Sequence, residues 1–179
     1  MAAILAGLSA AARELGAAES MQAPAAPGEG GLSHTSEAIH QEIVFGASRR
    51  RIYQALTSVK RFDALTRLSE AARLVTAAGA KPTTISHEVG GLFTLFGGYI
   101  TGRNLELVRD ERLVQAWRTA SWNPGDYSVV RFALIENGAG TKLIFDHRGF
   151  PEGEGTHLAK GWHSNYWEPL AKLLSQARS

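Results

Sequence analysis

The sequence contains no cysteine and no apolar run long enough to cross a membrane. The absence of cysteine excludes disulfides, thiolate metal sites and cysteine nucleophiles. A spanning helix needs about 18 or more consecutive apolar residues, so no membrane span is expected. The formal charge is only +2, and lysine and arginine are scattered apart from Arg49, Arg50 and Arg51. Nucleic-acid binding needs a clustered basic face and is therefore not expected either.

Residues 1–35 differ in composition from the rest of the chain. Residues 2–12 are small and mostly apolar, and residues 23–31 are rich in proline, glycine and alanine. A secretory signal should begin with positive charge, yet no lysine or arginine precedes this apolar run. The pattern favours a flexible tail over an export-signal remnant, and a cytoplasmic location over export. Residues 36–179 are expected to form one domain.

The remaining patterns predict a strand, a helix, several more strands and a long closing helix. Residues 38–47 alternate between apolar and polar types, which is typical of a strand. Ser48 is a candidate N-cap for a helix over residues 49–65, and a short helix and a loop are expected over 66–80. Alternating stretches then follow at 83–89, 90–108, 112–120, 127–136 and 141–149, and a helix is expected over 156–177. This order predicts an α+β domain with helices packed on one face of a curved antiparallel sheet.

The closing helix gathers large side chains on one arc when successive residues are placed about 100° apart. Lys160, Ser164 and Glu168 fall on the opposite, polar arc. Pro169 lacks a backbone donor, so a bend is expected between Asn165 and Pro169. The predicted apolar arc contains Leu158, Trp162, Tyr166, Pro169, Leu170 and Leu173.

A long helix lying across a curved sheet leaves space that is either filled by large side chains or left as a cavity. Both a solid core and a ligand pocket are compatible with the apolar pattern. In the pocket interpretation Gln115 and His147 supply polar points, and Phe62 and Phe93 line the entrance. The apolar walls are then formed by Trp117, Phe132, Phe145, Trp162 and Tyr166.

His147 is the strongest candidate for chemistry, because it ends a strand whose inward neighbours are apolar. It could act as a general base, or it could be a buried histidine held by ordinary hydrogen bonds. No Ser-His-Asp elbow or His-Glu-His signature is present, so no metal site and no catalytic set is predicted. No cofactor is expected.

Four stretches in this order resemble the activator of Hsp90 ATPase homologue-like family, within the superfamily of START lipid-transfer and polyketide cyclase domains. They are IHQEIVFGASRRRIYQALTSVKRFDALT, GGLFTLFGGYITGRNLELV, RLVQAWRTASWNPGDYSVVRFAL and GTKLIFDHRGFPEGEGTHLAKGWHSNYWEPL. The resemblance covers about residues 38–177 and is to bacterial single-domain members. It implies the helix-grip fold, in which a curved antiparallel sheet wraps around a long C-terminal helix.

The resemblance implies a scaffold with a cavity and assigns no reaction. We expect the chain to bind a small hydrophobic or amphipathic molecule between the sheet and the closing helix, with a stress response as a possible setting. A co-chaperone-like contact with a chaperone is the alternative. A cyclase or hydrolase using His147 is a third hypothesis, and a non-enzymatic role is favoured over it.

Overall fold

The computed structural model describes residues 37–176, so the predicted tail at 1–35 lies outside the described residues. Seven antiparallel strands form one sheet in the order β1-β7-β6-β5-β4-β3-β2. Their bounds are β1 Ala38–Phe45, β2 Thr84–Ile85, β3 Leu92–Leu95, β4 Ile100–Val108, β5 Arg112–Thr119, β6 Ser128–Asn137 and β7 Gly140–Arg148. The helices are α1 Arg49–Thr57, α2 Val59–Thr66, α3 Ala72–Thr76, η1 Phe96–Gly98, α4 Gly155–Trp162, η2 His163–Trp167 and α5 Glu168–Gln176.

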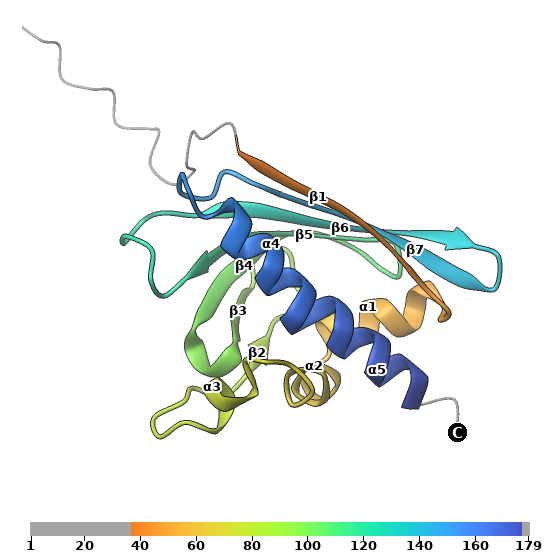
Figure 1. The fold of residues 1–179 in the computed structure, drawn as a ribbon, viewed down its shortest axis with the longest axis horizontal. Helices are drawn as coiled ribbons and strands as arrows, with labels where there is room; N and C mark the ends of the chain where they lie inside the picture. Colours follow the sequence, from red (N-terminus) through yellow and green to blue (C-terminus); the bar gives the residue numbers. More distant parts are fainter. Residues whose placement is uncertain (1–36, 177–179) are drawn as a thin grey trace, which may run out of the picture.

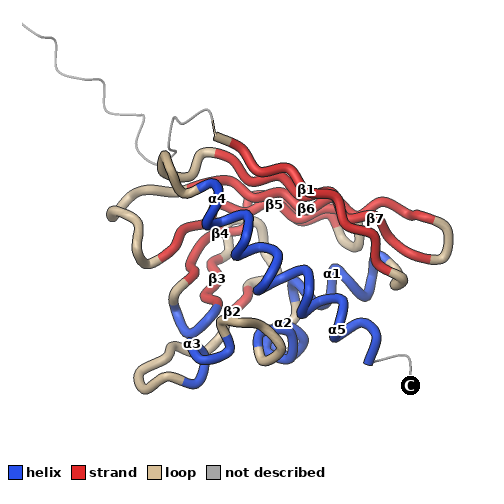
Figure 2. Tube along the Cα trace, viewed as in Figure 1, coloured by secondary structure: helices blue, strands red, loops and turns tan. Residues whose placement is uncertain are grey.

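The helices lie on one side of the curved sheet, and the long C-terminal helix runs across its concave face (Figure 1; Figure 2). The α+β helix-grip prediction is confirmed by this arrangement. Strand alternation sends Leu143, Phe145 and His147 to the inner face of β7, where all three are fully buried. None of the helices between residues 37 and 176 is long and apolar enough to cross a bilayer.

The predicted helix at 49–65 is two helices rather than one. Ser58 takes an extended backbone conformation, with φ −94° and ψ 123°, and separates α1 from α2. The break turns the chain so that both helices pack beside the C-terminal helix (Figure 1). Ser48 does occupy the N-cap position of α1, but its side chain makes no capping hydrogen bond.

The long C-terminal helix is continuous from Gly155 to Gln176, with a π-helical turn in its middle. The irregularity predicted before Pro169 takes this form: Glu168 N donates to His163 O, five residues back. Pro169 lacks an N–H, so a regular α-helical ladder could not continue through this point. The helix begins under the Glu37 carboxylate, which accepts hydrogen bonds from Gly153 N at 3.1 Å and Gly155 N at 3.2 Å.

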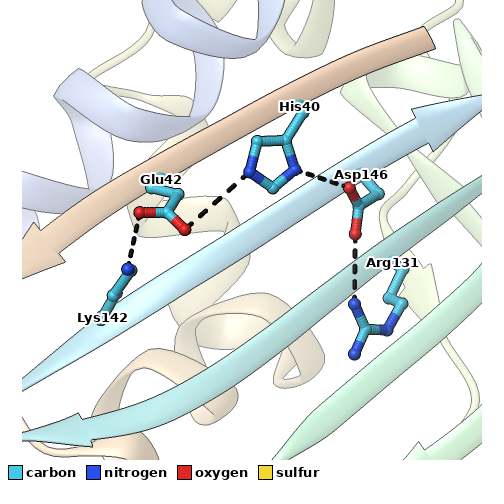
Figure 3. A network of polar contacts seen from close by, with 5 residues as sticks. All are labelled: His40, Glu42, Arg131, Lys142 and Asp146. Atoms are coloured by element: carbon cyan, nitrogen blue, oxygen red, sulfur yellow. Dashed lines mark hydrogen bonds and ion pairs between the residues drawn. The ribbon is translucent and has the colours of Figure 1, made fainter.

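The opposite face of the sheet carries a row of polar contacts across β1, β7 and β6 (Figure 3). His40 Nδ1 lies 2.8 Å from Asp146 Oδ1, Arg131 Nη1 lies 3.1 Å from Asp146 Oδ2, and Lys142 Nζ lies 2.6 Å from Glu42 Oε2. Burial raises the pKa of Asp146, but hydrogen bonds from His40 and Arg131 outweigh it and hold the pKa below its usual range. Exposed ion pairs of this kind add little to stability individually. The main effect of the row is therefore to place positive and negative groups side by side on this face of the sheet.

Candidate functional site

A cavity of about 470 Å³ lies where the C-terminal helix, the α3 segment and the β3–β4 turn meet the sheet. This volume is within the range of about 300–1,000 Å³ that is usual for small-molecule pockets. Its apolar and aromatic walls are Leu74, Phe96, Tyr99, Ile100, Trp117, Leu158, Trp162 and Tyr166. Its polar walls are Glu70, Arg73, Thr119, His157, Lys160, Ser164 and Asn165. The combination provides an apolar floor and a polar opening.

Trp162 is the centre of the aromatic floor. Its ring centroid lies 4.3 Å from that of Tyr166, 4.4 Å from that of Phe145 and 5.4 Å from that of Trp117. All four side chains are buried. Packed aromatic rings of this kind lose little conformational freedom when a ligand covers them, so the floor is preorganised.

The turn between β3 and β4 brings Phe96 into the wall. Phe96, Gly97 and Gly98 all have positive φ, at 50°, 68° and 96°. A Cβ on Gly97 would lie 2.2 Å from the Leu74 carbonyl oxygen, so only glycine allows α3 to pack this closely on the turn. The close packing explains why Leu74 and Phe96, far apart in sequence, line the same cavity.

The π-helical turn fixes the other wall. Asn165, within the turn, accepts a hydrogen bond from the backbone of Ala71 through its Oδ1 at 2.8 Å. This bond ties the start of the α3 segment to the C-terminal helix, and both residues line the cavity. π turns occur often at functional sites, because they reposition side chains that a regular helix would aim elsewhere.

His147 lies behind the floor in a fully paired network. Trp162 Nε1 donates to His147 Nδ1 at 3.0 Å, and His147 Nε2 lies 2.7 Å from Ser128 Oγ, which donates to Trp117 O at 3.0 Å. These contacts assign the proton to Nε2, because Nδ1 accepts from the indole. Burial lowers the pKa of His147 to about 3, so the imidazole is neutral near pH 7. The geometry therefore leaves no free lone pair for a general base.

Trp117 and Tyr166 supply the polar atoms of the floor. Burial raises the pKa of Tyr166, and the neighbouring Trp117 indole opposes that rise. The Trp117 Nε1–H is buried, and its contact with Tyr166 falls short of a well-formed hydrogen bond. A ligand acceptor that reached this N–H would give the donor a better partner.

The structure distributes the predicted site residues over three places. Trp117, Trp162 and Tyr166 line the cavity. Phe145 and His147 do not line this cavity, and they contact Trp162 from behind its floor.

The remaining predicted residues surround a second space of only about 10 Å³, which also touches Tyr166. Such a volume holds roughly one water-sized sphere and no larger ligand. Gln115 Nε2 donates to the buried Asn104 Oδ1 at 3.0 Å, so one of its two amide N–H groups is already used within the fold. Phe62 and Phe93 are each 1 % exposed and lie within the core rather than at an opening. This space is lined by Phe62, Phe93, Gln115 and Phe132, among others.

Sequence reasoning missed the residues that surround the opening. Lys160 and Ser164 fall on the polar arc of a regular helix, yet both line the cavity. Arg73 and Leu74 belong to the segment 66–80, whose mixed periodicity gave no basis for placing side chains. The sequence did contain one signal for the turn at Phe96, the consecutive glycines Gly97 and Gly98. Glycines within a strand pattern indicate a bend or a close approach of another backbone segment. Among the described residues, no group of three or more acidic, histidine or cysteine side chains could hold a metal ion.

Comparisons with known proteins agree with this architecture. The human activator of 90 kDa heat shock protein ATPase homolog 1 is 29% identical over 112 residues, which are 63% of this chain and 33% of that protein. The corresponding activator from Dictyostelium discoideum is 34% identical over 93 residues, 51% of this chain and 24% of its own length. The chain thus spans about a third or less of these curated relatives.

Solved structures show the same fold. An Hsp90 activator from Plasmodium falciparum superposes with a TM-score of 0.66 at 25% identity, covering 77% of this chain and 96% of that one. A protein from Chromobacterium violaceum superposes with a TM-score of 0.61 at 20% identity, covering 78% and 98%. These relatives include eukaryotes and bacteria, so the bacterial origin stays a prediction. The profile of the family described as activator of Hsp90 ATPase homolog 1-like protein matches residues 46–175, and the chain therefore belongs to that family.

Proposed function

We propose that the chain binds one small hydrophobic or amphipathic molecule in the cavity beneath its C-terminal helix. The observation that supports this most directly is the cavity of about 470 Å³ with an aromatic floor. A role in a stress response belongs to the same proposal, because matched relatives are named as activators of a heat shock protein ATPase. No step of chemistry is proposed, since His147 has both ring nitrogens engaged.

Gly161 offers a way to close the cavity without disturbing its walls. It lines the cavity from α4, and a Cβ there would lie 3.9 Å from Asn165 Nδ2, which is ordinary contact. A larger side chain would therefore extend into the open space. Leucine and alanine also favour helix more than glycine does, by up to about 1 kcal/mol.

Native mass spectrometry of the purified chain, before and after organic extraction, tests the proposal. We expect the wild type to carry a copurifying small molecule that extraction removes. Gly161→Leu should lose this molecule while keeping or raising its melting temperature, and Gly161→Ala, which adds one carbon, should retain it. If the purified wild type carries no small molecule and binds no apolar fluorophore, the proposal is wrong and the interior is better described as a packed core.

A contact with a chaperone is the second candidate, and the uncovered sheet face favours it. This face carries the contacts among His40, Glu42, Lys142, Asp146 and Arg131 (Figure 3). Strand alternation places the exposed apolar side chains Val44 and Ile135 on the same face. A pull-down with purified Hsp90 tests it, using Lys142→Glu to reverse one charge of the face. If an unrelated protein of similar charge recovers as much Hsp90 as this chain does, this candidate function is wrong.

A further inference from the structure

The opening of the cavity brings together two cations from separate elements. Arg73 comes from α3 and Lys160 from α4, and both line the cavity while remaining exposed. Within residues 37–176 neither side chain takes part in an ion pair. In contrast, Lys142, Arg131 and Arg49 elsewhere on the surface each meet a carboxylate. The cations at the opening are therefore available to a ligand.

The rest of the opening does not cancel this charge. Glu70 is the one carboxylate among the described residues that line the cavity. Two cations against one carboxylate leave a positive balance over an apolar floor. Guanidinium and ammonium groups bind carboxylate, sulfonate and phosphate oxygens through charge-assisted hydrogen bonds, which are about twice as strong as neutral ones.

We propose that the ligand is an amphipathic anion. Its apolar body lies on the floor formed by Trp117, Trp162 and Phe96, and its acid group lies at the opening between Arg73 and Lys160. This inference rests on the proposed function, because it names the class of molecule that the same cavity takes. A neutral molecule of the same shape would leave both cations without a partner, and a cationic one would be repelled by them.

Two fluorophores with the same aromatic body separate charge from shape. Anilinonaphthalene sulfonate carries an acid group, and the neutral phenylnaphthylamine lacks only that sulfonate. Both become fluorescent in apolar surroundings, so their dissociation constants can be measured by titration at low and high salt. We expect the sulfonate to bind more tightly than the neutral probe, and its advantage to shrink as salt screens the charges.

Charge variants then identify the groups responsible. Arg73→Gln and Lys160→Gln should each weaken binding of the sulfonate about threefold, and the double variant about tenfold, as expected for solvent-exposed ion pairs. Glu70→Gln should strengthen it. Each of these changes should affect binding of the neutral probe less than binding of the sulfonate. Lys172→Gln is the matched control, because Lys172 is an exposed lysine of α5 that does not line the cavity.

Gly161→Leu shows whether the probes use the cavity, and it should abolish binding of both. If both probes bind the wild type equally and the charge variants change nothing, the anion inference is wrong while the proposed function stands. If Lys172→Gln weakens the sulfonate as much as Lys160→Gln does, the effect is one of overall charge and the inference is also wrong. If neither probe binds the wild type, the proposed function fails and the inference fails with it.

Discussion

His147 shows how one buried residue makes the whole fold sensitive to acid. Its pKa is lowered from 6.5 to about 3 because burial penalises the charged imidazole. In the unfolded chain the same side chain takes up a proton near pH 6.5. Between these two values the unfolded state binds more protons than the folded state. The free energy of unfolding must therefore fall as the pH is lowered from about 6.5 toward 3.

We predict that His147 contributes a slope of about 1.4 kcal/mol per pH unit across this window. Urea denaturation of the wild type and His147→Asn at several pH values between 4 and 7 measures it. The variant should be less stable at pH 7, because asparagine is too short to contact both Trp162 Nε1 and Ser128 Oγ as His147 does, but its stability should depend less on pH. Equal slopes for wild type and His147→Asn would contradict the prediction.

For single residues, the sequence predicts the face of the sheet on which a side chain lies better than it predicts the group to which that side chain hydrogen-bonds. Strand alternation placed Phe145 and His147 on the inner face, and both are fully buried. The acceptor role of His147 toward Trp162 could not be predicted, because the two residues lie on different elements whose relative position depends on the packing of the whole core. The same holds for Gln115, whose partner Asn104 lies on the neighbouring strand.

Among the elements, the C-terminal helix departs most from its predicted pattern. A regular helical wheel placed Leu173, and not Leu174, among the residues of the apolar arc. In the structure Leu174 is buried and Leu173 is only partly so, and Trp167 is buried as well. The π turn at His163–Trp167 shifts the phase of every residue that follows it. The sequence signal was Pro169, which indicated an irregularity but not its type.

The hydrogen bond from Ala71 N to Asn165 Oδ1 holds the α3 segment over the cavity, and its loss should loosen that segment. We predict that Asn165→Ala costs about 1 kcal/mol of stability. Amide hydrogen exchange over residues 67–80 should become faster than in the wild type, while exchange in β6 and β7 should change little. Ser164→Ala, which removes a neighbouring hydroxyl that also lines the cavity, is the control. A uniform rise in exchange across the whole chain would argue against a local role.

Residues 37–176 form one sheet with its helices on one face (Figure 2). A single core joins the larger elements of this part of the chain. The chain contains four tryptophans, and Trp117, Trp122, Trp162 and Trp167 are all buried in that core. The order of elements and the concave side of the sheet could be predicted from alternation and turn residues. The volume of the cavity could not, because an apolar pattern is the same for a filled and an unfilled interior.

We predict that urea unfolding follows one cooperative transition. Tryptophan fluorescence, which reports on the core, and far-ultraviolet circular dichroism, which reports on the backbone, should give coincident curves. A ligand that binds only the folded state should move both curves together to higher urea. Curves that separate would mean that part of the structure unfolds independently of the tryptophan core.

The π turn also limits how the chain can change in length. Its hydrogen bond spans one residue more than that of an α-helix, so the turn is equivalent to an α-helix that has accommodated an insertion. Deleting one residue between His163 and Trp167 would restore a regular α-helical turn and leave Leu170 and Leu174 facing the core. Inserting one further residue there would instead rotate α5 by about 100° relative to α4, and Leu170 and Leu174 would leave the core. Substitutions in this segment test single contacts, whereas such an insertion would disconnect the two halves of the helix from one common interior.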